Sequence, residues 1–220
     1  MEIKETSTLD KARQVNFDTS IYGSFAEIGA GQEVTRFFFQ AGGASKTIAK
    51  TMSAYDMTFS DAIYGKEKTG RYVCENRLIK MLDKEYDLME ERLGPTRGKD
   101  TRFFAFANTV AAKSSERGIN EGHGWIGIRF QLKPQGPVNE VVLHVKVKDA
   151  RNILQQETLG VVGTNLIFAA YFHNKNPQDF VLSLMDNLDR RRIDINFIRF
   201  SGKDFEKFDN HILNLLLQKD

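Results

Sequence analysis

The chain has 220 residues, of which 41% are hydrophobic and 27% charged, a composition typical of a single globular domain. Its 31 basic and 29 acidic side chains leave a formal net charge of +2, which predicts no nucleic-acid partner and no anionic membrane surface. The single cysteine, Cys74, excludes a disulfide within the chain and a cysteine-based zinc site.

The N-terminal residues alternate charged and hydroxyl side chains, so they lack the apolar core of a secretory signal. The most apolar run, residues 160–172, is shorter than the roughly 20 residues that span a bilayer. We therefore expect a cytoplasmic protein with a flexible N-terminus over residues 1–14. Residues 15–220 are expected to form one mixed α+β domain, which could be the N-terminal part of a longer protein.

The first hundred residues are predicted to be helical, with helices over residues 30–41, 45–64 and 72–93. The second of these depends on apolar side chains spaced four, three, four and four residues apart, at Ile48, Met52, Tyr55, Phe59 and Ile63. Gly94 and Pro95 are expected to end the third helix, because proline cannot continue the hydrogen-bond ladder.

The period then changes to that of strands. Residues 101–112 are apolar on both faces, while residues 125–133 and 141–148 alternate apolar and polar side chains around a turn at 134–137. The short connections predict a three-stranded antiparallel meander.

A helix–helix–strand–helix part is expected to complete this α+β fold, behind the helical N-terminal layer and the meander. Its predicted elements are a helix over 150–173, a helix beginning at Asn176 and Pro177, a strand over 193–200 and a helix over 204–218 capped by Ser201. Asn165 lies in the apolar helix, and we expect its amide to be hydrogen-bonded to a structural partner.

Two glycine-rich segments resemble phosphate-binding loops only in part. Residues 41–47 lack the glycines that the GxxxxGK[ST] pattern needs at Gln40 and Ser45, and follow a predicted helix rather than a strand. The helix expected to start at Ser45 could bind an anion through its free N–H groups and Lys46, or the segment could be a plain helix–helix turn. Gly29 and Gly31 form the second segment, and a lone GxG is weak support for a ligand site.

One face of the predicted sheet is the main candidate for a ligand site. Strand pairing places Arg129, Gln131, His144 and Lys146 on one sheet face, with Trp125 near its end and His123 accessible between glycines. A cationic face with an aromatic edge suits an anionic, ring-bearing ligand. The alternative is that this is simply the solvated face of an antiparallel sheet.

No catalytic constellation is recognisable in the sequence. There is no GxSxG elbow, and the four histidines form neither HxxxH nor HExxH, so no metal site is predicted. The pattern therefore names no cofactor and no catalytic residue, and it leaves open whether the protein is an enzyme.

From about residue 14 to its end, the chain resembles a family of uncharacterised bacterial proteins. The segments that carry the resemblance are residues 25–34, 47–50, 53–57, 60–61, 102–107, 123–125 and 127–131. Members are often labelled nicotinate or nicotinamide mononucleotide adenylyltransferase, or TonB-dependent receptor. The chain lacks both the HxGH-type motif of the former and the signal peptide and many alternating strands of the latter. The resemblance supplies relatives and no site residues.

Two hypotheses on function follow. The first is a cytoplasmic domain that binds an anionic, nucleotide-like small molecule. The second is a non-catalytic scaffold or homo-oligomerisation domain, because the consecutive Phe37, Phe38 and Phe39 cannot all face one core from one helix.

Overall fold

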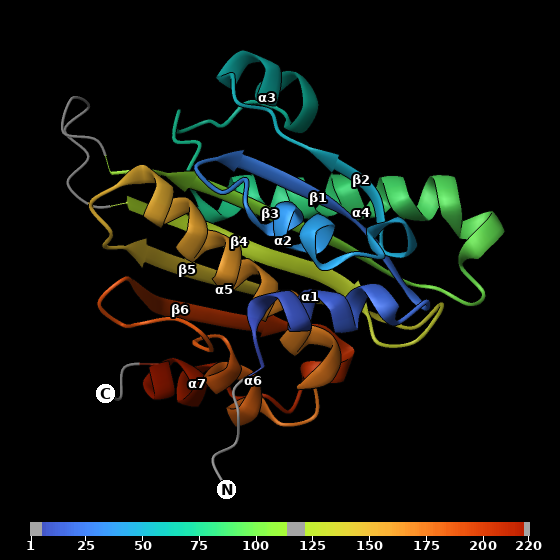
Figure 1. Cartoon of the computed structure of the whole chain (residues 1–220). Helices are drawn as coiled ribbons and strands as arrows, with labels where there is room; N and C mark the ends of the chain where they lie inside the picture. The colour runs from blue at the N-terminus through green and yellow to red at the C-terminus, as the bar shows by residue number, and fades with distance from the viewer. Residues whose placement is uncertain (1–5, 114–121, 218–220) are drawn as a thin grey trace, which may run out of the picture.

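In the computed structural model, which describes residues 6–113 and 122–217, six strands form one mixed sheet in the order β2-β1-β3-β4-β5-β6 (Figure 1). The strands are β1 (Ile21–Gly29), β2 (Ile48–Met52), β3 (Arg102–Ala111), β4 (Gly122–Gln131), β5 (Val138–Val147) and β6 (Ile193–Ser201). Strand β1 pairs in parallel with β2 and β3, and the remaining neighbours pair antiparallel.

Helices cover both faces of this sheet, so the fold has three layers (Figure 1). The helices are α1 (Thr8–Phe17), α2 (Val34–Ala41), α3 (Met57–Tyr64), α4 (Glu75–Arg97), α5 (Asn152–Phe172), α6 (Pro177–Ser183) and α7 (Asn210–Leu217), with 3-10 turns η1 (Ala44–Lys46) and η2 (Lys203–Phe205). Among the described residues, no helix combines the length and the apolar character needed to cross a bilayer.

The alternation of the strands divides the core between the two faces. Phe25, Phe106 and Phe130 lie in the larger cluster, under α1, α2 and α5. Leu78 and Leu82 of α4 lie in a smaller cluster on the opposite face. Buried side chains on both sides explain why β3 is apolar without interruption from Phe103 to Ala107.

Helix α5 approaches α2 closely because it carries glycine where the two helices meet. A Cβ atom at Gly163 would lie 2.4 Å from a Val34 methyl group, and one at Gly160 would lie 2.7 Å from the Phe37 ring. Phe38 is buried and Phe39 is 54% exposed, so the three consecutive phenylalanines face three different surroundings.

The predicted α+β class and the helix–helix–strand–helix order at the C-terminal end agree with this architecture. The three-stranded antiparallel meander is wrong as a description of the sheet, because β1, β2 and β6 join the predicted strands and two pairings are parallel. The helical N-terminal layer is also wrong in part, since β1 and β2 lie within the first hundred residues. Residues 8–14 of the segment expected to be flexible form part of α1, and residues 1–5 lie outside the described residues.

Three helix boundaries differ from the prediction. Residues 45–64 form η1, β2 and α3 instead of one helix. Helix α4 continues through Pro95 to Arg97, where Gly98 N–H donates to the Gly94 carbonyl (3.0 Å). The final helix begins at Asn210, and the residue before η2 is Gly202, with a φ of 108°, so Ser201 is part of β6 and not a helix cap.

Candidate functional site

The α4 face of the sheet carries a half-exposed cluster of rings beside α4. Helix α4 packs mainly on β1, β3 and β4, and the rings follow on β4, β5 and β6. Trp125 lies opposite His144 in the β4–β5 register, and His144 lies opposite Phe197 in the β5–β6 register. The hairpin that the sequence predicts is what brings Trp125 and His144 together.

The rings are close enough to form one surface, which we call the histidine–tryptophan patch: His123, Trp125, His144 and Phe197. Ring centroids are 4.8 Å apart for Trp125 and His144, 5.7 Å for Trp125 and Phe197, and 5.8 Å for His123 and His144. His144 Nδ1 donates to Asn196 Oδ1 (2.7 Å), which fixes the orientation of the imidazole because an amide oxygen can only accept.

Three basic side chains lie close together at the patch: His123, His144 and Lys146. His123 lies opposite Lys146 in the β4–β5 register. Burial lowers the pKa of His123 below its usual 6.5, and the neighbouring His144 and Lys146 lower it further. A bound anion would oppose the last two effects and favour the protonated imidazole.

A hollow of about 340 Å³ lies at the start of β6, and its apolar lining belongs to the larger core cluster, on the face of the sheet opposite the patch. Its polar lining includes Lys146 and Asn196, and Asn196 bonds His144 of the patch. Arg190 adds a second cationic side chain and Asp194 an acidic one, and the apolar lining consists of Met185, Ile193, Ile195 and Leu217. The volume is at the lower end of the range for small-molecule sites.

Arg129 and Gln131 lie on the same face but make structural contacts. Arg129 forms an ion pair with Asp83 of α4, and its Nε lies 3.8 Å from Glu140 Oε2. Gln131 is buried, with its Oε1 accepting from Phe103 N–H (3.2 Å). Six residues of extended strand separate Gln131 from Trp125, roughly 20 Å, so one small ligand would not contact both.

Lys46 is not part of this site. It ends the single 3-10 turn η1 beside β2, at the opposite edge of the sheet from β6, and its Nζ lies 5.1 Å from the centroid of the Phe17 ring. The helix start that the sequence predicts at Ser45 does not exist, so its N–H groups cannot form the expected anion site.

The glycine-rich segment after β1 lies at the carboxyl ends of parallel strands, where α/β sheets commonly bind anions. Here the chain's own carboxylate occupies that position. Glu27, 2% exposed, accepts from Val34 N–H (3.0 Å), Thr35 N–H (3.1 Å) and Thr35 Oγ1 (2.6 Å). The Asn108 amide fills the space that a Cβ at Gly31 would need, at 2.3 Å. The N-terminus of α2 is therefore already capped from within.

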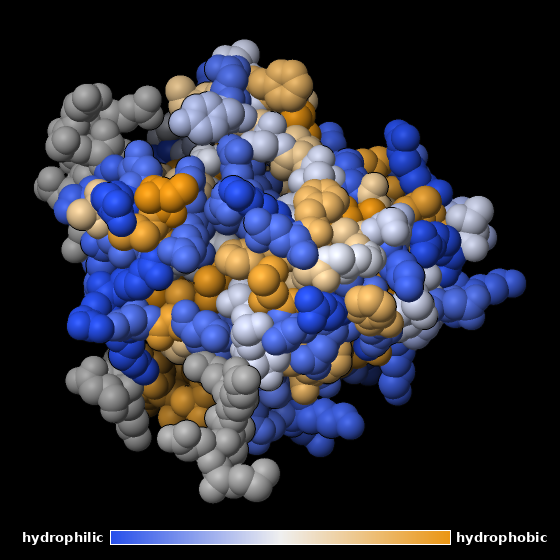
Figure 2. All heavy atoms as spheres, viewed as in Figure 1, coloured by the Kyte–Doolittle hydropathy of each residue, from blue (hydrophilic) through white to orange (hydrophobic). Residues whose placement is uncertain are grey.

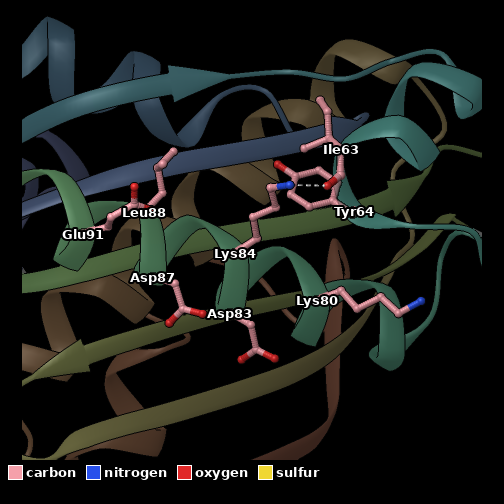
Figure 3. Close-up of a pocket in the computed structure, with 8 residues that line it drawn as sticks. All are labelled: Ile63, Tyr64, Lys80, Asp83, Lys84, Asp87, Leu88 and Glu91. Atoms are coloured by element: carbon pink, nitrogen blue, oxygen red, sulfur yellow. Dashed lines mark hydrogen bonds between the residues drawn. The ribbon is translucent and has the colours of Figure 1, made fainter.

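A larger hollow of about 510 Å³ lies between α3 and α4 (Figure 3). In Figure 3, Lys84 reaches back toward α3, where its Nζ donates to the Ile63 carbonyl (2.8 Å). Lys80 is paired with Glu67 (2.9 Å). The lining adds three acidic side chains, Asp83, Asp87 and Glu91, so this hollow does not favour an anionic ligand.

Several residues of the candidate site were not among the predicted site residues. Phe197 and Asn196 lie in a correctly predicted strand, but its pairing with β5 could not be read from the sequence. Arg190 lies in the connection that leads into β6. Among residues 6–113 and 122–217, no three His, Cys, Asp or Glu side chains gather as a metal-binding group.

Comparisons with known proteins bear on the fold. No protein-family model matches the chain, and no curated protein sequence matches it significantly. Among solved structures, a competence-damaged protein (CinA) superfamily protein from Enterobacter cloacae is 10% identical, with a TM-score of 0.50, over 77% of this chain and 93% of that chain.

Two further solved structures are similar. A competence or damage-inducible protein from Enterobacter asburiae is 9% identical, with a TM-score of 0.50, over 74% of this chain and 98% of the other. The competence/damage inducible protein CihA from Agrobacterium tumefaciens is 17% identical, with a TM-score of 0.45, over 74% and 93%. The chain thus shares a mixed α/β fold with the two Enterobacter proteins.

Proposed function

We propose that this protein binds a small anionic molecule that carries a planar ring, a nucleotide-like ligand, across the histidine–tryptophan patch and the hollow at the start of β6. The observation that carries the proposal is that two residues lining the hollow also meet the patch. Asn196 bonds His144, and Lys146 lies opposite His123 in the β4–β5 register.

The two halves of the ligand would have different partners. A planar ring would stack on Trp125, whose indole offers a broad apolar surface with a polar edge. A phosphate or carboxylate group would receive charge-assisted hydrogen bonds from Lys146 and His123. Burial is the main reason that the pKa of His123 is lowered, and an anion bound beside it would oppose the smaller effects of His144 and Lys146.

The site lies away from the capped N-terminus of α2, so the proposal does not depend on a glycine-rich phosphate loop. Binding is the whole of the proposed activity. The residues of the patch and the hollow supply a stacking surface and hydrogen-bond donors.

Isothermal titration of the full chain with adenosine monophosphate tests the proposal, with adenosine and inorganic phosphate titrated separately. We expect the nucleotide to bind more tightly than either fragment, since it uses both halves of the site. Lys146→Met is expected to weaken the affinity about tenfold, near 1.4 kcal/mol. Lys133→Met, in the turn at the other end of β4, is the matched control and is expected to bind as the unmodified chain does. No heat of binding from a folded sample, with nucleotide or with phosphate, contradicts the proposal.

A further inference from the structure

Two consecutive residues of β6 direct their side chains to the histidine–tryptophan patch. His144 Nδ1 donates to Asn196 Oδ1 (2.7 Å), and the Phe197 ring belongs to the patch itself. Successive side chains of a regular strand point to opposite faces, so a regular β6 could not supply both. The β5–β6 register shifts at this point, because Phe197 lies opposite His144 and the next pair is Ile195 with Val145. Asn196 is therefore the extra residue of a β-bulge, which aims its amide at the patch.

The hydrogen bond to Asn196 determines which nitrogen of His144 carries the proton. An amide oxygen only accepts, so Nδ1 carries the hydrogen and, in the neutral imidazole, Nε2 is left as an acceptor. The directions of the two nitrogens from the ring centre diverge by about 144°, like two non-adjacent corners of a pentagon, so Nε2 points away from β6. Strand β4, which carries His123 and Trp125, lies on that side of β5. Within residues 6–113 and 122–217, the His144 ring makes no hydrogen bond besides the one to Asn196.

This acceptor lies on the α4 face of the sheet. On the other face, α5 packs on β4 and β5, and Figure 2 shows that side of the molecule, where hydrophilic side chains surround small apolar groups. On the α4 face, Trp125 and His144 are both half-exposed. Their ring centroids are 4.8 Å apart and their planes meet at 58°, so His144 stands beside the indole and does not lie flat on it. A planar ring stacked on Trp125 would therefore have its edge close to His144.

We propose that His144 Nε2 accepts a hydrogen bond from an amino group on the edge of the ligand's ring, so that the site selects rings such as adenine that carry an exocyclic NH2 group. This inference rests on the proposed function, because it needs a ring stacked on Trp125. Asn196 is the positioning residue, since it holds the imidazole in the tautomer that accepts. A ring without the amino group leaves Nε2 without its donor, and a site built for a hydrogen bond discriminates against a ligand that cannot make it.

Isothermal titration with two nucleotides at pH 7.5, about one unit above the usual pKa of histidine, tests this selection. Adenosine monophosphate and purine riboside monophosphate share the purine ring system, ribose and phosphate and differ in one amino group. We expect adenosine monophosphate to bind about tenfold more tightly. His144→Phe keeps an aromatic ring beside Trp125 but offers no acceptor, and it is expected to bind both nucleotides equally. His173→Phe, which replaces a half-exposed imidazole directly after α5, is the matched control and is expected to keep the tenfold ratio.

Asn196→Leu tests the positioning role separately. Without the amide oxygen, the proton of the imidazole can lie on either nitrogen, so the preference for adenosine monophosphate is expected to shrink while the affinity for purine riboside monophosphate stays the same. Nitrogen-15 NMR of the His144 ring reports the tautomer in the free protein. We expect the Nδ1–H form in the unmodified chain and a mixture of both forms in Asn196→Leu.

The outcomes separate this inference from the proposed function. Equal affinities of the unmodified chain for the two nucleotides, or a tenfold preference that survives in His144→Phe, overturn the inference and leave the proposed site in place. An Nε2–H tautomer in the free protein also overturns it, because Nε2 would then donate. If neither nucleotide binds, the proposed function itself is wrong, and the inference is wrong with it.

Discussion

Lys11 Nζ donates a hydrogen bond to Asn165 Oδ1 across 2.9 Å and so ties α1 to the middle of α5. Both side chains are buried, Lys11 at 1% exposure. The Asn165 amide also donates to the carbonyls of Leu184 (3.0 Å) and Asp186 (2.7 Å), and the Asp186 carboxylate lies 2.5 Å from Lys11 Nζ. The expectation that Asn165 has a structural partner is confirmed. This one amide joins the N-terminal helix, the central helix and the segment that leads to β6.

Replacing Asn165 with leucine keeps the volume but removes an acceptor from a buried ammonium group and a donor from two carbonyls. We expect the free energy of unfolding to fall by about 3 kcal/mol, measured by denaturant titration. The double variant with Lys11→Met should lose less than the sum of the two single losses, because the substitutions remove the same interaction. Gln178→Leu, at an exposed position of α6, is the control and should change stability little. Additive losses would mean that the two side chains act independently.

The buried Glu27 gives stability a pH dependence with a definite sign. Burial raises its pKa from 4.5 to about 7, although its hydrogen bonds from α2 and Asn108 lower it. The folded protein therefore holds the proton more tightly than the unfolded chain. The stabilising contribution is fully present below pH 4.5 and is lost as the pH rises through about 7, a change of roughly 3 kcal/mol.

Unfolding free energies of Glu27→Gln measured across this pH window check the assignment. We expect the Glu27→Gln variant not to show the decrease in unfolding free energy that Glu27 causes as the pH rises through about 7. Glu33→Gln, on the loop that leads into α2, should keep it. An unchanged slope in Glu27→Gln would assign the pH dependence to another group.

Ligand affinity at the proposed site should depend on pH through His123. Its pKa lies below 6.5 in the free protein, so binding of an anion requires proton uptake when the pH is higher. We expect adenosine monophosphate to bind more tightly as the pH falls through this range. Because the phosphate of the nucleotide titrates near pH 6 as well, His123→Asn is needed as the reference. Identical pH profiles for the two proteins would remove His123 from the site.

Asn139, and not Ser201, caps the turn η2 that follows β6. Its Oδ1 accepts from Asp204 N–H (3.1 Å) and its Nδ2 donates to the Asp204 carboxylate (2.7 Å), at the start of η2. We expect Asn139→Ala to lower the free energy of unfolding by about 1–2 kcal/mol, the usual loss of a cap. Ser201→Ala, near neutral in this structure, is the comparison. Thermal unfolding of both variants is enough to rank them.

The elements that the sequence predicts well are those with a single possible period. The alternation of β4 and β5 has period two, and the long apolar stretch of α5 exceeds any strand. Residues 48–63 lack this property. Two side chains spaced four residues apart share one face in a helix and also in a strand. The spacing of Ile48 and Met52 therefore fits both elements, and the predicted helix over 45–64 is a strand at this point. Strand β1 is buried on both faces and shows no alternation at all.

Some contacts of the candidate site residues could be predicted from the sequence and others could not. Trp125 and His144 meet because a hairpin register follows from the strand pattern. Asp83, one partner of Arg129, could not be foreseen, since it comes from α4, more than forty residues earlier. Lys46 was assigned to an anion site through a helix that does not form. The pairing of Trp125 with His144 follows from the strand pattern, whereas the contacts of Arg129 and Lys46 come from elements distant in the sequence.

Asn210 and Asn214 of α7 bond the backbone N–H and carbonyl of Phe200 and Ile198 of β6, at 2.7 to 3.0 Å. Helix geometry limits how many residues of a strand can be bonded in this way. Four residues of α-helix advance about 6.0 Å, and two residues of strand about 6.7 Å, so asparagines at positions i and i+4 match alternate residues of a strand to within about 0.7 Å. At a third asparagine, this mismatch in position along the strand would double and would exceed the range of hydrogen-bond distances. A straight helix can therefore imitate a β-strand for two rungs only. Within that reach, an Asn-x-x-x-Asn helix supplies donors and acceptors to the outer backbone of two alternate residues of an edge strand.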